Sequence, residues 1–126
     1  MNVVDSSGWL EFFAGGPNAG FFAAALQATD ELVVPVVSVY EVFKRVLAQR
    51  GESGALEAVA LMQQGTVIDP TISTAIDAAR LSVEAGLPMA EAIILSTARG
   101  HGALLWTQDA HFEGMGGVRY VSARST

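Results

Sequence analysis

Four acidic residues stand at separate points of the chain, each at the expected end of a strand or the expected start of a helix. They are Asp5, Glu41, Glu91 and Asp109. Three of them follow apolar runs typical of buried parallel strands, whose carboxyl ends meet at one edge of a sheet. Four carboxylates at one edge repel each other unless a cation joins them, and a divalent metal ion is the simplest such cation. The pattern therefore predicts a metal-dependent hydrolase.

The elements that must position these acids are indicated by apolar β-branched runs that alternate with amphipathic segments. The expected strands cover 2–4, 32–37, 66–69, 103–106 and 118–121, with the last at a sheet edge. The expected helices are a first one carrying Trp9, followed by 19–28, 39–49, 55–64, 71–84 and 88–101. This order predicts a three-layer α/β/α sandwich around a central, mainly parallel sheet of four to five strands. We expect a single domain over residues 1–126.

Composition limits the classes of protein that the chain can represent. Hydrophobic residues make up 51% of the chain and charged residues only 16%, so part of the surface is apolar and suits a protein partner. No apolar stretch approaches the roughly 20 residues of a membrane span, and the N-terminus lacks a signal-type segment. The chain has no cysteine, which excludes disulfides, thiolate metal ligands and cysteine nucleophiles. We therefore expect a protein of the reducing cytoplasm.

The net charge of −6 disfavours a protein that holds nucleic acid by bulk electrostatics, because such proteins usually present a basic surface. The objection weakens if several of the acids share one metal pocket, where bound cations cancel their charge. An acidic surface equally suits a basic protein partner.

Each acid also has a local structural explanation. Asp5 could cap a helix, and Asp109 could form a turn after a strand. Ser38 and Glu41 match the S-x-x-E capping box, in which the glutamate side chain bonds the amide of the capping residue. Glu91 could complement the dipole of the helix that it begins. The joint order of the four acids favours a shared role over four separate ones.

This order and its surroundings resemble the PIN-domain nuclease family, and most closely the toxin ribonucleases of VapC-type toxin-antitoxin pairs. The resemblance covers nearly the whole chain and is carried by the segments 3–9, 38–42, 90–98 and 105–112. It implies an acidic metal site for Mg²⁺ or Mn²⁺ formed by Asp5, Glu41, Glu91 and Asp109. It also implies that the hydroxyls of Ser6 and Thr107 orient carboxylates or a water molecule. One residue departs from the family pattern, because Glu91 stands where aspartate is more common.

The resemblance also implies an activity and partners. The activity is metal-dependent endoribonuclease cleavage, and the partners are an RNA substrate, an inhibitory antitoxin and a second copy of the chain. Candidates for contact with RNA or antitoxin are Lys44, Arg45, Arg99 and His111. A set of aromatic side chains suggests a groove for a partner helix, although half of them are expected in the core: Trp9, Phe12, Phe13, Phe21 and Phe22.

Two other functions remain open at this point. One is a non-catalytic PIN-like module that binds an antitoxin and aids repression of its operon. The other is an α/β phosphatase or phospho-acceptor domain, because such folds also place an aspartate after the first strand. Ser7 disfavours the haloacid-dehalogenase type, which requires a second aspartate at that position. Lys44 is the only lysine, whereas a receiver domain requires one late in the chain.

Overall fold

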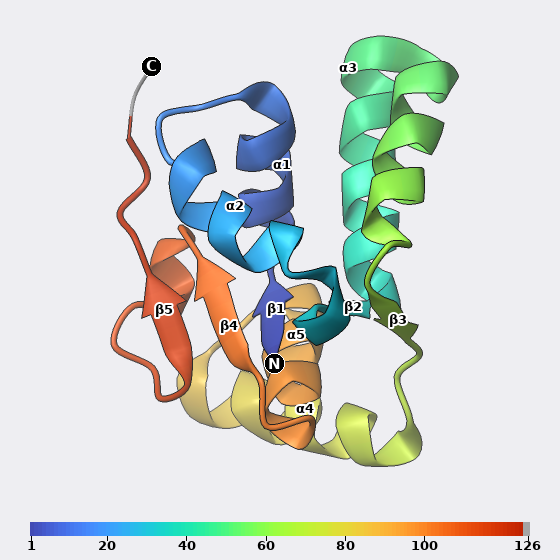
Figure 1. Cartoon of the computed structure of the whole chain (residues 1–126). Coiled ribbons are helices and arrows are strands. Elements are labelled where there is room, and N and C mark those ends of the chain that lie inside the picture. Colours follow the sequence, from blue (N-terminus) through green and yellow to red (C-terminus); the bar gives the residue numbers. More distant parts are fainter. Residues whose placement is uncertain (125–126) are drawn as a thin grey trace.

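The structure is a computed structural model that describes residues 1–124. Strands and helices alternate along most of the chain (Figure 1). The strands are β1 (Asn2–Val4), β2 (Val33–Pro35), β3 (Thr66–Ile68), β4 (Leu104–Thr107) and β5 (Val118–Tyr120). The α-helices are α1 (Ser6–Ala14), α2 (Ala19–Gln27), α3 (Val36–Met62), α4 (Ile72–Ala85) and α5 (Met89–Gly100), and two 3₁₀ helices are η1 (Thr29–Glu31) and η2 (Ala110–Phe112).

The strands form one parallel array in the order β3-β2-β1-β4-β5. Hydrogen bonds pair β1 with β4 and β4 with β5, and a separate ladder pairs β2 with β3. A parallel bridge between Asn2 and Leu32 joins the two parts. Because every pairing is parallel, the carboxyl ends of β1, β2 and β4 face the same edge. The expected edge position of the last strand is confirmed, since β5 pairs with β4 alone among the described strands.

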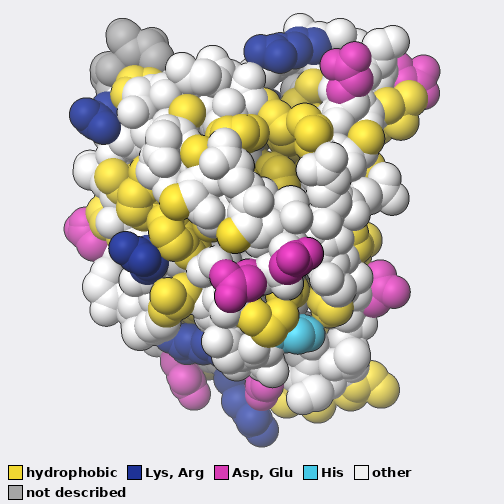
Figure 2. Space-filling view, in the orientation of Figure 1, with side chains coloured by type: hydrophobic (Ala, Val, Ile, Leu, Met, Phe, Trp, Pro, Cys, Tyr) yellow, Lys and Arg dark blue, Asp and Glu magenta, His cyan; other side chains and the backbone are white. Residues whose placement is uncertain are grey.

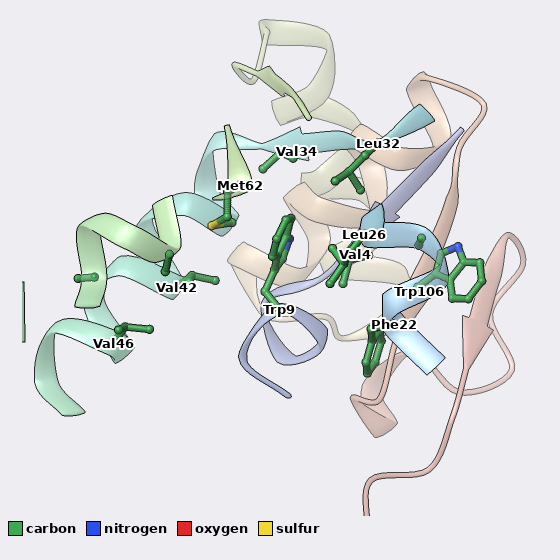
Figure 3. Close-up of a cluster of buried hydrophobic side chains, with 13 residues drawn as sticks. Val4, Trp9, Phe22, Leu26, Leu32, Val34, Val42, Val46, Met62 and Trp106 are labelled. Atoms are coloured by element: carbon green, nitrogen blue, oxygen red, sulfur yellow. The ribbon is translucent and has the colours of Figure 1, made fainter. Parts of the chain in front are cut away.

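Neighbouring residues in each central strand face opposite layers of helices. Val4, Val34 and Trp106 join the core formed with α1, α2 and α3, which Figure 3 shows around Trp9. Val3 and Leu105, one residue earlier in β1 and β4, join the second core with α4 and α5. This alternation follows from the two-residue period of a strand. The predicted three-layer sandwich with a parallel sheet is confirmed.

The junction between β2 and α3 differs from the sequence prediction. We predicted a strand over 32–37 and a helix capped by Ser38, but β2 ends at Pro35 and α3 begins at Val36. Pro35 has φ −63° and no N–H, so it ends the strand ladder and suits the start of a helix. Ser38 is fully buried inside the first turn and caps nothing. The β-branched run after Pro35 had indicated a longer strand.

Helix α3 is a hairpin of two arms. The break lies at Gly51, whose φ of 79° and ψ of −177° are non-helical and suit glycine. The two helices predicted over 39–49 and 55–64 correspond to these arms, which run side by side in Figure 1. The predicted break between them is confirmed. The hairpin stands beside α1, and its first arm carries Glu41.

Helices α4 and α5 cover the other face of the sheet and follow each other across a bend of 119°. The Thr71 side chain caps α4 by accepting a hydrogen bond from the Thr74 N–H, and Gly86 ends the helix with φ 70°. Pro88 precedes α5, which places Glu91 in the first turn of that helix. Within residues 1–124 no single helix has both the length and the apolar composition to cross a membrane, although α4 and α5 meet these criteria as a bent pair.

Candidate active site

Asp5 follows β1 directly and begins α1 from a buried position. Its side chain is only 3% exposed. Its Oδ1 accepts hydrogen bonds from the Ser7 hydroxyl at 2.8 Å and from the Gly8 N–H at 3.1 Å, and its Oδ2 accepts one from the Thr107 hydroxyl at 2.8 Å. An ionised carboxylate offers about four acceptor positions. The remaining position of Asp5 therefore lies on Oδ2, beside Thr107.

Thr107 connects Asp5 to Asp109. The pairing of β1 with β4 sets Val4 opposite Trp106, which brings the next residues, Asp5 and Thr107, together at the carboxyl edge. The fully buried Thr107 hydroxyl donates to Asp5 and accepts the Asp109 N–H at 2.9 Å. One hydroxyl thus holds both the first and the last of the predicted acids in a defined arrangement.

Glu41 reaches the neighbourhood of Asp5 through Ser6. The Ser6 hydroxyl in α1 donates a hydrogen bond of 2.5 Å to Glu41 Oε1 in α3. Since Ser38 lies inside the helix, Glu41 has no capping box to complete, and that local explanation of the residue is wrong. The Ser6–Glu41 contact instead ties the start of α1 to the first arm of the hairpin.

Glu91 and Asp109 meet at a histidine. His111 Nδ1 lies 2.8 Å and 3.1 Å from the two carboxylate oxygens of Glu91, and 3.3 Å from Asp109 Oδ1. Asp109 also accepts the His111 N–H at 2.9 Å and thereby caps the short helix η2. Suitable ligand atoms of the three residues all lie within 4.8 Å of one another. These residues form the Glu91–Asp109–His111 cluster.

Two acids of the site, Asp5 and Glu91, lie in an environment that disfavours their charge. Burial raises the pKa of Asp5 to about 6, and the Asp109 charge adds to the rise, although the hydrogen bonds from Ser7, Thr107 and Gly8 oppose it. Burial, a hydrogen bond to Asp109 and the charge of Asp109 raise the pKa of Glu91 to about 7, against the opposing effect of His111. The contact with Glu91 raises the pKa of His111. Without a cation Asp5 and Glu91 therefore keep their protons to a higher pH than ordinary surface carboxylates do.

A groove of about 430 Å³ runs between α1 and the two arms of α3. Ser7 and Gln108 line it and border Asp5 and Asp109 respectively. Phe13 contributes an apolar wall. The charged lining is mixed, with Arg45 and Arg50 from α3, Glu11 from α1 and Glu57 from α3. Figure 2 shows apolar side chains inside the hollow between these helices, with basic side chains above it. None of the four predicted acids is among the residues that line the groove, so Ser7 and Gln108 are the lining residues that adjoin the site.

Two of the four predicted contact residues lie elsewhere. The Lys44 ammonium stands 5.6 Å from the Tyr40 ring centre, beside an exposed apolar patch on α3 that is separate from the groove. Arg99 donates to the Gly116 carbonyl at 2.9 Å and so holds the loop before β5. Arg45 lines the groove and His111 joins the acids, so these two are the predicted contact residues nearest the site.

The sequence profile of the PIN domain family matches residues 3–118 of the chain. The chain belongs to the PIN domain family. Solved structures agree on the fold: a toxin-antitoxin complex from Klebsiella pneumoniae (22% identity, TM-score 0.80) covers 94% of this chain and 96% of its own. VapC20 of Mycobacterium tuberculosis, described as a sarcin-ricin loop cleaving toxin (17% identity, TM-score 0.76), covers 92% and 95%. DNA-bound VapBC from Salmonella typhimurium (14% identity, TM-score 0.75) covers 97% of each chain. A comparison with curated protein sequences finds no match.

Three polar residues of this PIN domain adjoin the site but received no site role from the sequence: Ser7, Asn18 and Gln108. Ser7 donates to Asp5, and its position two residues after an aspartate at a helix start was an available signal. Asn18 is buried and donates at 3.0 Å both to Gln108 Oε1 and to the Ser122 carbonyl, while it accepts from Arg124. No local pattern indicates these Asn18 contacts, because its partners lie about 90 to 106 residues away in the chain.

The five aromatic residues of the first two helices divide between the core and the surface, as predicted. Trp9 and Phe22 are buried core residues, whereas Phe12, Phe13 and Phe21 are only partly covered. Phe13 lines the groove of the PIN domain, and Phe12 lines a separate hollow beside the end of α2. The aromatic residues of α1 and α2 therefore contribute to both the core and the surface.

Proposed function

We propose that this PIN domain is a metal-dependent endoribonuclease, and that it acts in the cytoplasm as the toxin of a toxin-antitoxin pair. One observation carries the proposal: Asp5, Thr107 and Asp109 are joined by short hydrogen bonds at the carboxyl edge, with Glu91 beside Asp109. Solved relatives with the same fold, which include toxin-antitoxin complexes and a cleaving toxin, support the biological role.

The residues at this edge fit a divalent cation. Carboxylate oxygens are the ligands that Mg²⁺ and Mn²⁺ prefer, and Asp5 retains an acceptor position on Oδ2. The raised pKa values of Asp5 and Glu91 support the same conclusion, since a bound cation would offset the cost of the charge on both carboxylates. We propose Asp5 and Asp109 as the main ligands, with Glu41 and Glu91 as further ligands or water-mediated contacts.

The chemistry follows from the positions of these groups. A bound Mg²⁺ or Mn²⁺ supplies positive charge that eases deprotonation of an attacking water and stabilises charge on the phosphate. Thr107 and Ser7 keep the Asp5 carboxylate oriented, and Ser6 does the same for Glu41. Glu91 lies beside Asp109 at this edge and, where it is not itself a ligand, would accept the proton of the attacking water.

The groove between α1 and α3 is the surface that we propose for the antitoxin. Its apolar wall suits an amphipathic segment of a partner, and its mixed charges suit ion pairs of both signs with that segment. Because Ser7 and Gln108 line it, an occupant can extend to the acidic residues and block RNA. The homodimer also remains a proposal, and sedimentation of the partner-free protein tests it.

The decisive test is cleavage of total cellular RNA by purified, partner-free protein with Mg²⁺, Mn²⁺ or a chelator. We expect discrete fragments that require metal and that disappear in Asp5→Asn. The matched control is Asp30→Asn, because Asp30 is an exposed aspartate in η1, which precedes β2 and so lies toward the opposite edge of the sheet. Asp30→Asn should cleave like the wild type.

Intact RNA under every condition, from folded protein that still binds metal, would overturn the nuclease proposal. It would favour the alternative of a non-catalytic module that binds an antitoxin and aids operon repression. The DNA-bound VapBC complexes of Rickettsia felis and Salmonella typhimurium, which share the fold, are the observation that favours this alternative. The family match over residues 3–118 gives the phosphatase alternative no support.

A further inference from the structure

The His111 side chain is aimed at the two acids that approach from α5 and from the turn after β4. Its Nδ1 lies 2.8 Å from Glu91 Oε2 and 3.3 Å from Asp109 Oδ1. The backbone of His111 is fixed as well, because its N–H donates to the same Asp109 carboxylate at 2.9 Å. The imidazole is thus placed by a short hydrogen-bonded turn and not by a free loop.

The spacing of these donor atoms suits ligands of one ion. Metal–ligand bonds of about 2.1 Å in an octahedral site place adjacent donor atoms about 3.0 Å apart. The distances from His111 Nδ1 to Glu91 and Asp109 range from 2.8 to 3.3 Å. Suitable atoms of all three residues lie within 4.8 Å of one another. An ion could therefore contact both carboxylates and the ring nitrogen with little rearrangement of the side chains.

Glu91 makes this arrangement possible. The residue lies on α5, and its extra methylene carries the carboxylate about 1.5 Å farther than an aspartate side chain would reach. Both of its oxygens then lie within 3.1 Å of His111 Nδ1. Glu91 and His111 are therefore in direct contact, so the site offers a nitrogen donor in addition to carboxylate oxygens.

We propose that His111 is a metal ligand, and that it forms with Glu91 and Asp109 a nitrogen-oxygen site that favours Mn²⁺, Co²⁺ or Zn²⁺ over Mg²⁺. Imidazole nitrogen suits transition metals, whereas Mg²⁺ takes oxygen donors and keeps much of its water. The inference rests on the proposed function, because it concerns the metal site of the same nuclease. It replaces the view of His111 as a substrate contact. The competing explanation is that His111 is only an ion-pair partner of the two acids.

The chain offers a matched control for the test. It contains two histidines, and the second, His101, lies at the end of α5 with its Nδ1 2.9 Å from the Thr97 carbonyl. The variants His111→Ala and His101→Ala therefore each remove one imidazole and leave the other. The full chain should carry no polyhistidine tag, so that its own two rings are the only imidazoles present.

The first readout is direct coordination of nitrogen. Pulsed electron paramagnetic resonance of bound Mn²⁺ should show ¹⁴N coupling from imidazole in the wild type and in His101→Ala, and none in His111→Ala. The second readout is calorimetric affinity for Mn²⁺, Co²⁺ and Mg²⁺. We expect His111→Ala to lose about tenfold or more in affinity for Co²⁺ and Mn²⁺, and only a few-fold for Mg²⁺.

The outcomes separate this inference from the proposed nuclease. Wild-type protein that binds Mn²⁺ without imidazole coupling would overturn the role of His111 and leave an all-carboxylate nuclease intact. An equal loss of Mg²⁺ and Mn²⁺ affinity in His111→Ala would likewise contradict the selectivity and favour the ion-pair explanation. A folded wild-type protein that binds none of these metals would overturn both proposals. Circular dichroism of each variant establishes that it is folded.

Discussion

The two halves of the candidate site are built in different ways. Asp5 is 3% exposed and receives three hydrogen bonds, one of them from the adjacent strand β4. The Glu91 side chain is 18% exposed and that of His111 is 60% exposed, and they meet between α5 and η2. The register of β1 and β4 positions Asp5 in the first half. In the second half, the length of the Glu91 and His111 side chains decides whether they meet. Substitutions in the first half should therefore change the free energy of unfolding or its pH dependence as well as the chemistry, and those in the second should alter metal preference with little effect on the fold.

The largest effect should come from Asp5→Asn. We expect RNA cleavage to fall by about 100-fold or more, because the variant removes a main proposed metal ligand. We expect the metal-free protein to remain folded at pH 7.5, since the change also removes a carboxylate whose charge is disfavoured by burial. Cleavage assays and urea unfolding measure the two effects. An Asp5→Asn protein that loses activity because it no longer folds would contradict this prediction.

Removal of the Thr107 hydroxyl should have the next largest effect. Thr107→Val keeps the shape but leaves Asp5 without one donor and the Asp109 N–H without its acceptor. We expect the free energy of unfolding to fall by about 1–3 kcal/mol, as for other unpaired buried polar groups. Thr107→Ser retains the hydroxyl and should lose clearly less. Equal free energies of unfolding for the two variants would show that the Thr107 hydroxyl does not stabilise the arrangement of Asp5 and Asp109.

The pH dependence of stability tests the buried half next. Folding raises the pKa of Asp5 from 3.8 to about 6, so its contribution to the stability of the metal-free protein is complete below about pH 4 and is lost as pH rises through 6. Because each pKa unit corresponds to about 1.4 kcal/mol at most, the loss should be on the order of 1–2 kcal/mol. Unfolding with chelator at pH 4.5 and 7.5 measures it.

Asp5→Asn is the reference for this measurement because asparagine does not titrate. The variant should gain stability relative to the wild type as pH rises from 4.5 to 7.5. A stability difference between the two proteins that does not change with pH, or that changes in the opposite direction, would contradict a raised pKa of Asp5. Added Mn²⁺ should reduce the pH dependence of the wild type, since metal replaces the proton on Asp5.

The smallest effect on stability should come from Glu91→Gln. This side chain is partly exposed and belongs to the half that depends on side-chain reach, so we expect a change within about 0.5 kcal/mol. Its affinity for Mn²⁺ should nevertheless fall, because a carboxylate ligand is lost. A destabilisation as large as that of Thr107→Val would show that the two halves are equally important to the fold.

Much of the fold could be predicted because its signals are local. The period of apolar residues indicated the order of strands and helices, and Gly51 and Gly86 marked breaks that the backbone confirms with positive φ. The β2–α3 junction was predicted wrongly, since the β-branched residues after Pro35 favour a strand locally. Pro35 ends the strand ladder instead, and the partly exposed Val36 and Val37 form the first turn of α3, so the local strand propensity was outweighed.

The sequence alone determined which acids stand at the ends of strands and the starts of helices, because parallel strands deliver their carboxyl ends to one edge. Only the tertiary structure decided their partners. The register of β1 and β4 sets Thr107 beside Asp5, and the packing of α5 brings Glu91 to His111. These contacts join residues 102 and 20 positions apart in the chain, and no local pattern specifies such distances. The chemistry of the acids was therefore readable from the chain, whereas their pairing required the packed sheet.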